Sequence, residues 1–506
     1  MAHLLADLVR HTCSAHRDLT AITWKERKQI VSRTYNELEL DIALVRGFLV
    51  QEGLLKKHIV LAGPTSYEWV VTYLAITTAG STAVPLDAAL PTDELLELVK
   101  RSDAEAVFVS PAMADFDAQV RSTDSCPMLK KTFALDADML DKIRESGAQP
   151  TGYSGDVKPE DVCTIIFTSG TTGKSKGVCL TQQNLTDNVL SLRIDVKPGG
   201  VLLSVLPIHH AYCLTSDWMA GLYYGANIAI NDSLLRMVKN MTVFKPDMVL
   251  MVPLMLETIY KKLAAVDPSV PKEIVKEQVF GPNLKTIFSG GAHLDPFYVE
   301  EFAKYGITVS EGYGMSECSP TISMNGMDPD EVVPGSVGKP VANVEVKFEN
   351  GELLVRGTSV MKEYYQMPEE TAEAIQDGWL HTGDLAYQDE NGYLFITGRV
   401  KNLIILSGGE NISPEEIENK LALDPLIGEV VVTGKNNVLT AHIYPDQDVI
   451  EFKKLDEETV AAGIQKAIDD FNQKQPGYRR LTKVDIRKEP FVKSSTRKIK
   501  RALIED

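Results

Sequence analysis

A tract of small and hydroxyl residues with two lysines follows an apolar run at residues 164–167. It reads TSGTTGKSKG and spans 168–177. Glycines let several backbone amides point at one anion, hydroxyls add donors, and lysines add positive charge. The tract therefore predicts a phosphate-binding loop. Its candidate ligands are Thr168, Ser169, Gly170, Thr171, Thr172, Gly173 and Lys174.

This loop differs from the P-loop pattern GxxxxGK[ST]. That pattern would need glycine at position 168, where the chain has threonine. The alternative interpretation is a surface linker rich in Ser, Thr and Gly. Such linkers seldom follow a buried-strand pattern so directly, and the sequence therefore favours phosphate binding.

The elements that must hold this loop are short apolar runs that alternate with longer stretches of helical periodicity, such as 66–78. The runs lie at 58–63, 105–110, 164–169, 201–207 and 226–231. Strands that alternate with helices form a largely parallel sheet covered on both faces. The sequence therefore predicts an α/β fold.

The pattern changes twice toward the C-terminus. From residue 335 onward, shorter strands with charged turns predict a small antiparallel subdomain. Residues 401–506 indicate a compact α+β unit with helices over 414–421 and 457–475. Because 506 residues exceed what one hydrophobic core organises, we expect an N-terminal domain over 1–400 and a C-terminal domain over 401–506.

Composition narrows the class of protein. A formal net charge of −18 argues against a nucleic-acid partner, because phosphate backbones need a broad basic surface. The six cysteines show neither CxxC spacing nor a histidine partner pattern, so neither a zinc site nor a disulfide framework is indicated. No segment has the pattern of a signal peptide or a transmembrane helix, and we expect a cytoplasmic protein.

The longer segment TSGTTGKSKGVCLTQQNL resembles the signature of the adenylate-forming superfamily, which contains acyl-CoA synthetases, peptide-synthetase adenylation domains and luciferases. The resemblance runs from about residue 35 to the C-terminus, through several motifs in the family's order. The segments YGMSECSPTIS and LIILSGGENISPEEIE are most similar to medium- and long-chain fatty acyl-CoA synthetases. The resemblance implies that the chain uses ATP, Mg²⁺ and coenzyme A, or phosphopantetheine on a carrier protein.

EGYGMSECSP (311–320) resembles the family's second signature. By this resemblance Tyr313 lies against adenine, Ser316 contacts the α-phosphate and Glu317 binds Mg²⁺. A π-face, a hydroxyl and a hard carboxylate suit these three roles, although the motif alone could be a glycine-rich turn with an exposed acid.

SGGAHLDP (289–296), which alone would be a turn, resembles the segment that lines the adenine and acyl pockets. Its implied adenine-side residues are Gly291 and Ala292.

DGWLHTGDL (377–385) and the segment 392–418 resemble the family's ribose motif and domain junction. The resemblance implies that Asp384 accepts hydrogen bonds from both ribose hydroxyls and that Arg399 reaches the ribose or phosphate. It also implies that Lys401 is the hinge of a mobile C-terminal domain. Taken alone, Asp384 could be a turn or cap residue and Lys401 a solvated lysine. The glycines implied beside the thiol tunnel are Gly408 and Gly409.

VKSSTRKIKR (492–501) is similar to the family's terminal lysine motif, which makes Lys498 the implied catalytic lysine. A cation there can bridge the carboxylate and the reacting phosphate while charge develops. Taken alone, the segment is a solvated basic tail. Arg497 departs from the family, which usually has glycine at this position.

The segment 204–228 resembles one wall of the family's acyl pocket, with His210 beside the carboxylate in a positioning role. Peptide-synthetase domains have an aspartate where this chain has Tyr212, so a simple carboxylic acid is expected rather than an amino acid. The implied acyl-pocket residues are His210, Ala211, Tyr212, Cys213, Gly290, Gly312 and Met315.

The resemblance implies an ATP-dependent ligase that forms an acyl-adenylate and transfers the acyl group to CoA, most similar to fatty acyl-CoA synthetases. Two alternatives stay open at this point. One is an acyl-carrier-protein ligase or adenylation domain that loads a carrier. The other is a nucleotide-binding regulator without catalysis, which would have no need for Lys498.

Overall fold

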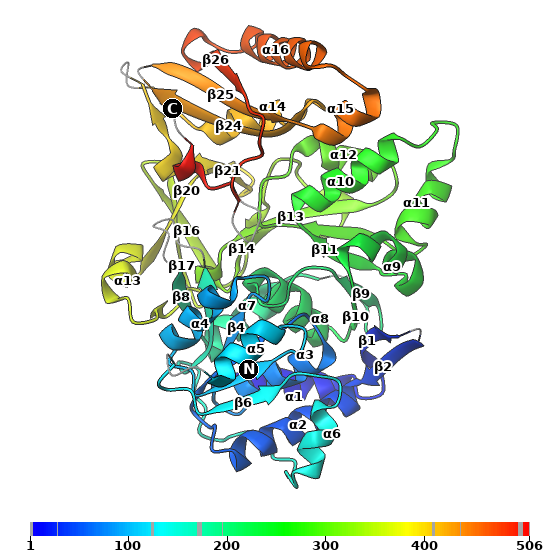
Figure 1. Ribbon diagram of the computed structural model, residues 1–506, viewed down its shortest axis with the longest axis vertical. Helices are drawn as coiled ribbons and strands as arrows, with labels where there is room; N and C mark the ends of the chain where they lie inside the picture. Colours follow the sequence, from blue (N-terminus) through cyan, green and yellow to red (C-terminus); the bar gives the residue numbers. More distant parts are fainter. Residues whose placement is uncertain are drawn as a thin grey trace. The chain divides into compact units, whose positions relative to one another are not determined.

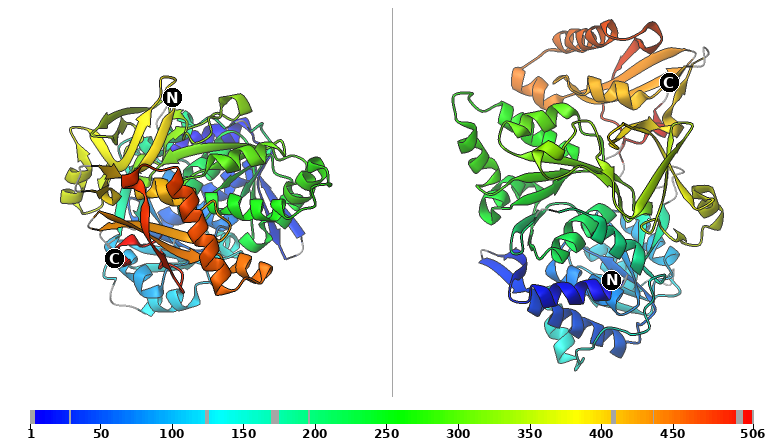
Figure 2. Two further views of the ribbon diagram at one scale, coloured as in Figure 1. Left: turned by 90° about the horizontal axis from the view of Figure 1, so that it is seen from above. Right: turned by 180° about the vertical axis from the view of Figure 1, so that it is seen from behind.

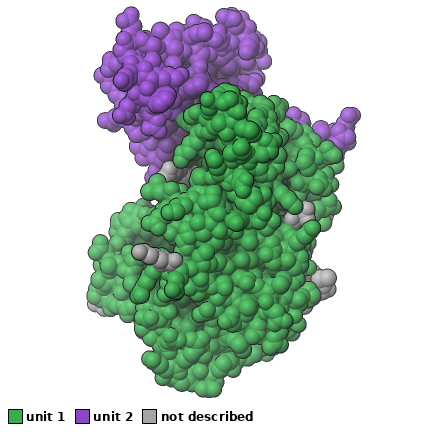
Figure 3. All heavy atoms as spheres, turned by 90° about the vertical axis from the view of Figure 1, so that its right-hand side faces the viewer, with its two compact units in different colours: residues 1–346, 355–380 green, residues 347–354, 381–506 purple. Residues whose placement is uncertain are grey.

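The computed structural model describes residues 4–27, 29–122, 126–168, 175–194, 196–406, 410–435, 437–493 and 499–504. The chain divides into two compact units (Figure 3). Unit 1 comprises residues 1–346 and 355–380, and unit 2 comprises residues 347–354 and 381–506. No helix in the described part of the chain is long and apolar enough to cross a membrane.

The first sheet of unit 1 has seven strands in the order β18-β8-β7-β4-β3-β5-β6. Figure 1 labels β4, β6 and β8 of this sheet. Their bounds are β3 (His58–Ala62), β4 (Thr82–Leu86), β5 (Ala106–Val109), β6 (Lys131–Ala134), β7 (Val162–Thr168), β8 (Lys176–Thr181) and β18 (Glu363–Tyr364). The neighbouring strands from β7 to β6 are parallel, whereas β8 is antiparallel to both β7 and β18.

Helices cover both faces of this sheet, as its uniformly buried strands β4 and β5 require. On one face, α4 (Thr92–Arg101) and α5 (Ala114–Ser122) contribute Leu98 and Phe116 to a core with Val60 and Val107. On the other face, Phe48 of α2 (Tyr35–Gln51) packs against Phe133. Helix α3 (Tyr67–Thr78) joins α2 there, in the blue part of the chain in Figures 1 and 2.

The second sheet of unit 1 has nine strands in the order β15-β14-β13-β12-β11-β9-β10-β1-β2. Their bounds are β1 (Thr20–Glu26), β2 (Gln29–Thr34), β9 (Val201–Ser204), β10 (Asn227–Ile230), β11 (Met248–Met251), β12 (Thr286–Ser289), β13 (Thr308–Gly314), β14 (Thr321–Met324) and β15 (Lys339–Pro340). The strands from β13 to β1 are parallel, and the strands at both edges are antiparallel. The carboxyl ends of β9, β12 and β13 therefore share one edge of the sheet.

The remaining helices of unit 1 connect or cover these strands. They are α1 (Leu5–Ala15), α6 (Met139–Glu145), α7 (Gln182–Ser191), α8 (Ala220–Tyr223), α9 (Met237–Phe244), α10 (Pro253–Ala264), α11 (Lys272–Phe280), α12 (Pro296–Ala303) and α13 (Pro368–Ala374). A π-helix, η1 (Tyr212–Met219), runs directly into α8. π-Helical turns are rare in proteins, and those that do occur are frequently found at functional sites. Nothing in the sequence predicted this one.

Unit 2 contains a three-stranded sheet in the order β24-β25-β26, formed by β24 (Ile427–Lys435), β25 (Val438–Pro445) and β26 (Leu481–Ile486). Helices α14 (Pro414–Leu421) and α16 (Glu457–Gln473) contribute Ile417 and Ile464 to its core. The other elements are α15 (Gln447–Lys453) and the short pair β22 (Ile404–Ile405) and β23 (Asn411–Ile412).

Five strands lie around the division between the units: β16 (Val344–Glu349), β17 (Glu352–Gly357), β19 (Ile375–Gln376), β20 (Trp379–Gln388) and β21 (Leu394–Arg399). Within unit 2, β20 and β21 are antiparallel, with Asp384 opposite Arg399. The predicted α/β class, with largely parallel sheets, small antiparallel strands after residue 335 and a smaller C-terminal unit, is confirmed. Division at 400/401 and mobility of the smaller unit stay predictions.

A buried asparagine on α7 fixes the loop between β13 and β14. Asn188 has no exposed surface; its side-chain NH₂ donates to the carbonyls of Cys318 and Thr321 and to Ser359 Oγ, and its Oδ1 accepts from Thr321 N. A buried polar group that loses its partner costs about 1–3 kcal/mol. Asn188 therefore anchors the segment that carries Ser316 and Glu317.

We predict that Asn188→Ala lowers the free energy of unfolding by about 3 kcal/mol, because several buried groups lose their partner at once. Urea denaturation followed by tryptophan fluorescence measures this. The control is Thr242→Ala, which removes an exposed, helix-local hydrogen bond and should cost about 0.5 kcal/mol or less. Equal effects of the two substitutions would contradict the anchoring role.

Candidate active site

The β7–β8 hairpin brackets the predicted phosphate loop. Thr168 pairs with Lys176, and Phe167 pairs with Gly177. Thr168 and Lys176 are thus fixed side by side at the end of the hairpin. The other predicted ligands in this tract, residues 169–174, lie outside the described residues.

A tyrosine that the sequence analysis did not single out joins this hairpin to the second signature. Strand β18 places Tyr364 beside β8, where Lys176 Nζ lies 4.6 Å from the centre of the tyrosine ring. The Tyr364 hydroxyl donates to Glu317 Oε1 at 2.8 Å. Burial and the neighbouring Glu317 charge raise the pKa of Tyr364, so the phenol keeps its proton and acts as a donor at neutral pH.

Glu317 is thereby positioned by a hydrogen bond from a phenol. It lies in a short turn after β13, and its backbone carbonyl accepts from Met361 N at 2.8 Å. Among the described residues, the structure gives its carboxylate no ion-pair partner. A half-buried carboxylate that is held by a phenol fits Mg²⁺, which prefers hard oxygen ligands.

The predicted adenine and acyl residues of unit 1 gather at the shared edge of the nine-stranded sheet. Gly290 follows β12, Tyr313 belongs to β13, and Met315 and Ser316 follow β13. In open α/β sheets, ligands bind outside the carboxyl ends of the strands. Gly291 and Ala292, next along the chain after Gly290, are exposed.

The predicted acyl wall enters this region through the π-helix. The Tyr212 hydroxyl donates to the Phe288 carbonyl at 3.0 Å, and a Cβ on Gly290 would lie 3.1 Å from the tyrosine ring. A side chain at Gly312 would lie 2.6 Å from Phe288. A side chain at either glycine would therefore force the neighbouring ring to move, by more at Gly312 than at Gly290.

The two residues that flank Tyr212 point into the protein. Ala211 is buried, and the fully buried Cys213 thiol donates to the Leu206 carbonyl at 3.2 Å. His210 is half-buried and lies at the start of the π-helix, where its carbonyl accepts from Leu214 N. A role for these side chains in binding an acid stays a prediction.

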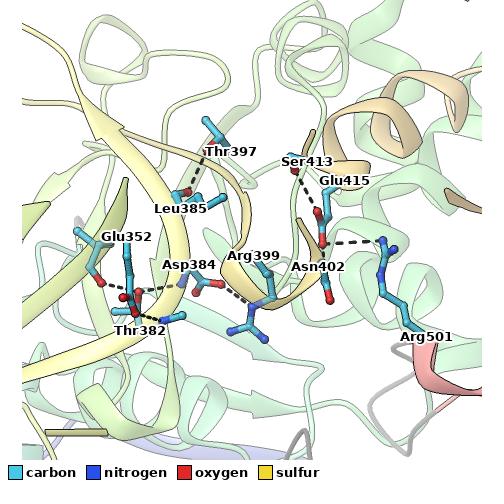
Figure 4. Close-up of polar contacts among 12 residues, drawn as sticks. Glu352, Thr382, Asp384, Leu385, Thr397, Arg399, Asn402, Ser413, Glu415 and Arg501 are labelled. Carbon is cyan, nitrogen blue, oxygen red and sulfur yellow. Dashed lines mark hydrogen bonds and ion pairs between the residues drawn. The ribbon is translucent and has the colours of Figure 1, made fainter. Parts of the chain in front are cut away.

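In unit 2, the predicted ribose and phosphate residues contact each other (Figure 4). Arg399 Nε donates to Asp384 Oδ1 at 2.6 Å, and the antiparallel register of β20 and β21 places the two residues opposite one another. The Thr382 hydroxyl accepts from Asp384 N and donates to the Leu353 carbonyl. Asp384 is thus held in place by its backbone as well as by the arginine.

The segments on both sides of the predicted catalytic lysine are fixed within unit 2. Lys493 forms a β-bridge with Ile499 and an ion pair with Glu429 at 2.6 Å. Arg501 forms an ion pair with Glu418 and lies 3.9 Å from Glu415 (Figure 4). Arg497 and Lys498 themselves, like Gly408 and Gly409, lie outside the described residues.

The predicted hinge residue, Lys401, belongs to the short turn that follows β21. Partial burial and the nearby Arg399 charge lower the pKa of Lys401, against the opposing effect of Asp384. A pivoting role for this residue stays a prediction.

Comparison with known proteins identifies the family. Residues 9–365 match the model of the AMP-binding enzyme, and residues 401–506 match that of the AMP-binding enzyme C-terminal domain. The chain belongs to the AMP-binding enzyme family. It is an AMP-forming acid–thiol ligase of the adenylate-forming superfamily, as its motifs predicted.

Three relatives illustrate the similarity. The chain is 29% identical to the long-chain-fatty-acid–CoA ligase FadD15 of Mycobacterium bovis, over 80% of this chain and 76% of that protein. It is 30% identical to a feruloyl-CoA synthase of Amycolatopsis sp, over 84% of this chain and 82% of that protein. The chain is also similar to MatB from Rhodopseudomonas palustris, whose ATP-bound crystal structure matches it with a TM-score of 0.81. The two are 26% identical in sequence, and the match covers 99% of this chain and 98% of the MatB chain.

A second acid beside the predicted pocket was also missed from the sequence. Glu311 of β13 is 5% exposed, and its Oε1 is buried without a hydrogen-bond partner among the described residues. Burial, helped by the Asp295 charge and opposed by the Gly335 backbone, raises the pKa of Glu311 to about 8. The carboxyl is therefore mostly protonated at neutral pH.

We predict that Glu311→Gln gains stability relative to the unmodified protein as pH rises from 6 to 9. Because the pKa of Glu311 is about 8 in the folded protein, above the ordinary value of 4.5, the folded state holds the proton more tightly, and this contribution to stability is lost as pH rises through 8. Glutamine does not titrate. Urea midpoints of the two proteins at both pH values measure the difference.

The control for this prediction is Glu273→Gln, at an exposed position in α11. Its difference from the unmodified protein should be the same at both pH values. A Glu311→Gln difference that does not vary with pH would show that the buried carboxyl is already charged at pH 6.

Proposed function

We propose that the chain is a fatty acyl-CoA synthetase that converts a fatty acid, ATP and CoA into acyl-CoA, AMP and pyrophosphate in the cytoplasm. The observation that carries the proposal is the contact between Tyr364 and Glu317 beside the β7–β8 hairpin. It brings a fixed, charged carboxylate to the strands that carry the phosphate-loop signature. That arrangement suits a magnesium–triphosphate substrate.

In this proposal, unit 1 binds most of the ATP. Residues 168–174 hold the phosphates, Tyr313 lies against adenine with Gly291 and Ala292, and Ser316 contacts the α-phosphate. Glu317 would hold Mg²⁺, whose charge offsets the charge that develops on the phosphate oxygens. The Tyr364 hydroxyl keeps the Glu317 carboxylate oriented, so little reorganisation is needed when ATP binds.

Unit 2 contributes the remaining groups. Asp384 accepts hydrogen bonds from the ribose hydroxyls. Arg399 orients the Asp384 carboxylate, which it already contacts, and reaches the ribose or phosphate. Lys498 bridges the carboxylate of the acid and the α-phosphate during adenylate formation. Lys401 is the proposed pivot at the 400/401 boundary, and Gly408 and Gly409 leave room for the thiol. Movement about this pivot would then present the adenylate to CoA.

The acid is proposed to be a fatty acid, bound by His210, Ala211, Tyr212, Cys213, Gly290, Gly312 and Met315. The similarity to a long-chain-fatty-acid–CoA ligase supports this class, and the feruloyl-CoA synthase makes an aryl acid the competing class. An α-amino group would find no acidic side chain at position 212, which is a tyrosine. The Tyr212 hydroxyl already donates a hydrogen bond to a backbone carbonyl. An amino acid is therefore disfavoured.

The test is a panel of fatty, aryl and amino acids, each supplied with MgATP in the presence and absence of CoA. We expect pyrophosphate release that depends on a fatty acid and continues to turn over only with CoA, with acyl-CoA identified by mass spectrometry. Pyrophosphate release with aryl acids but not with fatty acids would overturn the fatty-acid assignment. Release that CoA does not stimulate, but a phosphopantetheine carrier protein does, would overturn the CoA assignment.

The matched control for this panel is Lys498→Ala. It should lose acid-dependent pyrophosphate release yet largely keep thioester formation from supplied acyl-AMP. Activity that persists unchanged in this variant would come from a contaminating enzyme, or would show that Lys498 is not the catalytic lysine.

A further inference from the structure

Two histidines and an aspartate meet inside unit 1. Asp87 directly follows β4 of the seven-stranded sheet, whereas His209 and His210 lie between β9 of the nine-stranded sheet and the π-helix. Each side chain offers one ligand atom, and these atoms lie within 4.8 Å of one another. Among the described residues, this is the one group of three or more His, Cys, Asp or Glu side chains with such spacing.

The proposed function gives His210 a role but leaves Asp87 and His209 without one. His209 is 9% exposed, and its Nε2 is buried with no hydrogen-bond partner in the part of the chain that the structure describes. That atom lies 3.5 Å from Asp87 Oδ1, which is within ion-pair distance but long for a hydrogen bond. A buried ring nitrogen left in this way is costly unless something else binds it.

The donor set is specific in its chemistry. Two imidazoles and one carboxylate form the ligand set of open zinc sites, in which a fourth position stays available. Mg²⁺ prefers oxygen ligands, so this cluster differs in kind from the carboxylate at Glu317. We propose that Asp87, His209 and His210 bind one transition-metal dication, for which Zn²⁺ is the best match.

Only small movements would complete the site. Ligand atoms around a tetrahedral Zn²⁺ lie about 3.3 Å apart, given metal–ligand distances of about 2.0–2.1 Å. The His209–Asp87 pair is already at 3.5 Å, and the Asp87 side chain is fixed by a hydrogen bond that Oδ1 accepts from Ala89 N at 2.9 Å. The imidazole rings of His209 and His210 have centroids 4.3 Å apart, and the three ligand atoms, which now lie within 4.8 Å of one another, would have to move closer together.

The cysteines are poor competitors for Zn²⁺. All six cysteines are buried, and burial raises the pKa of Cys213 and Cys318 well above the ordinary value, so these thiols are poor metal ligands.

The test is Zn²⁺ binding to the full, metal-free chain, measured by isothermal titration calorimetry. We expect one strong site, weakened on the order of 10-fold or more by either Asp87→Asn or His209→Asn. The control is His442→Asn, because His442 is a buried histidine with one carboxylate partner, Asp485 at 3.0 Å, and should not bind Zn²⁺ strongly. Equal affinity in all four proteins would overturn the proposal.

A second measurement does not depend on whether the variants fold. X-ray absorption of the Zn²⁺-loaded unmodified chain should show nitrogen and oxygen ligands with the scattering pattern of two imidazoles. Sulfur ligands, or a spectrum with no imidazole scattering, would place the ion elsewhere and overturn the site.

Discussion

The hydrogen bond from Tyr364 to Glu317 is the interaction on which the candidate site of unit 1 depends. A carboxylate that binds a cation must be held in place and must also stay charged, and a neutral phenol meets both needs where a lysine or arginine would not. Three pieces of the fold make the contact possible: the pairing of β18 with β8, the turn after β13, and Asn188, which anchors that turn on α7. The phosphate hairpin and the second signature are thereby joined, although they are far apart in the sequence.

Unit 2 applies the same principle with different groups. The register of β20 and β21 sets Asp384 against Arg399, while ion pairs fix Lys493 and Arg501 on the two sides of the segment 494–498. The acid Glu418 at one of these ends is mostly buried, which raises its pKa to about 7 against the opposing effect of Arg501. Each unit thus positions its own charged groups before any substrate binds, which is the condition for low reorganisation during catalysis.

The sequence predicted what local pattern controls. Uniformly apolar runs gave β3, β5, β7, β9 and β10, and helical periodicity gave α3, α14 and α16 within a few residues. The ordered motifs gave the family. What the sequence could not predict depends on contacts between distant segments. The Tyr364 hydroxyl, the Asn188 anchor and the buried Glu311 are fixed only once strands pair, and the π-helix has no distinctive periodicity. No local sequence signal marks Tyr364, because its place beside the phosphate-loop strand depends on the pairing of β18 with β8.

The most direct test of this account replaces Glu317 by glutamine and measures acid-dependent pyrophosphate release over a range of Mg²⁺ concentrations. We expect a rate loss on the order of 100-fold and a higher Mg²⁺ requirement, because several kcal/mol of charge stabilisation are lost. Glu331→Gln, at an exposed position in the same unit, should retain the unmodified rate. If Glu317→Gln keeps both the rate and the Mg²⁺ dependence of the unmodified chain, the fixed carboxylate is not the cation ligand and the account is wrong.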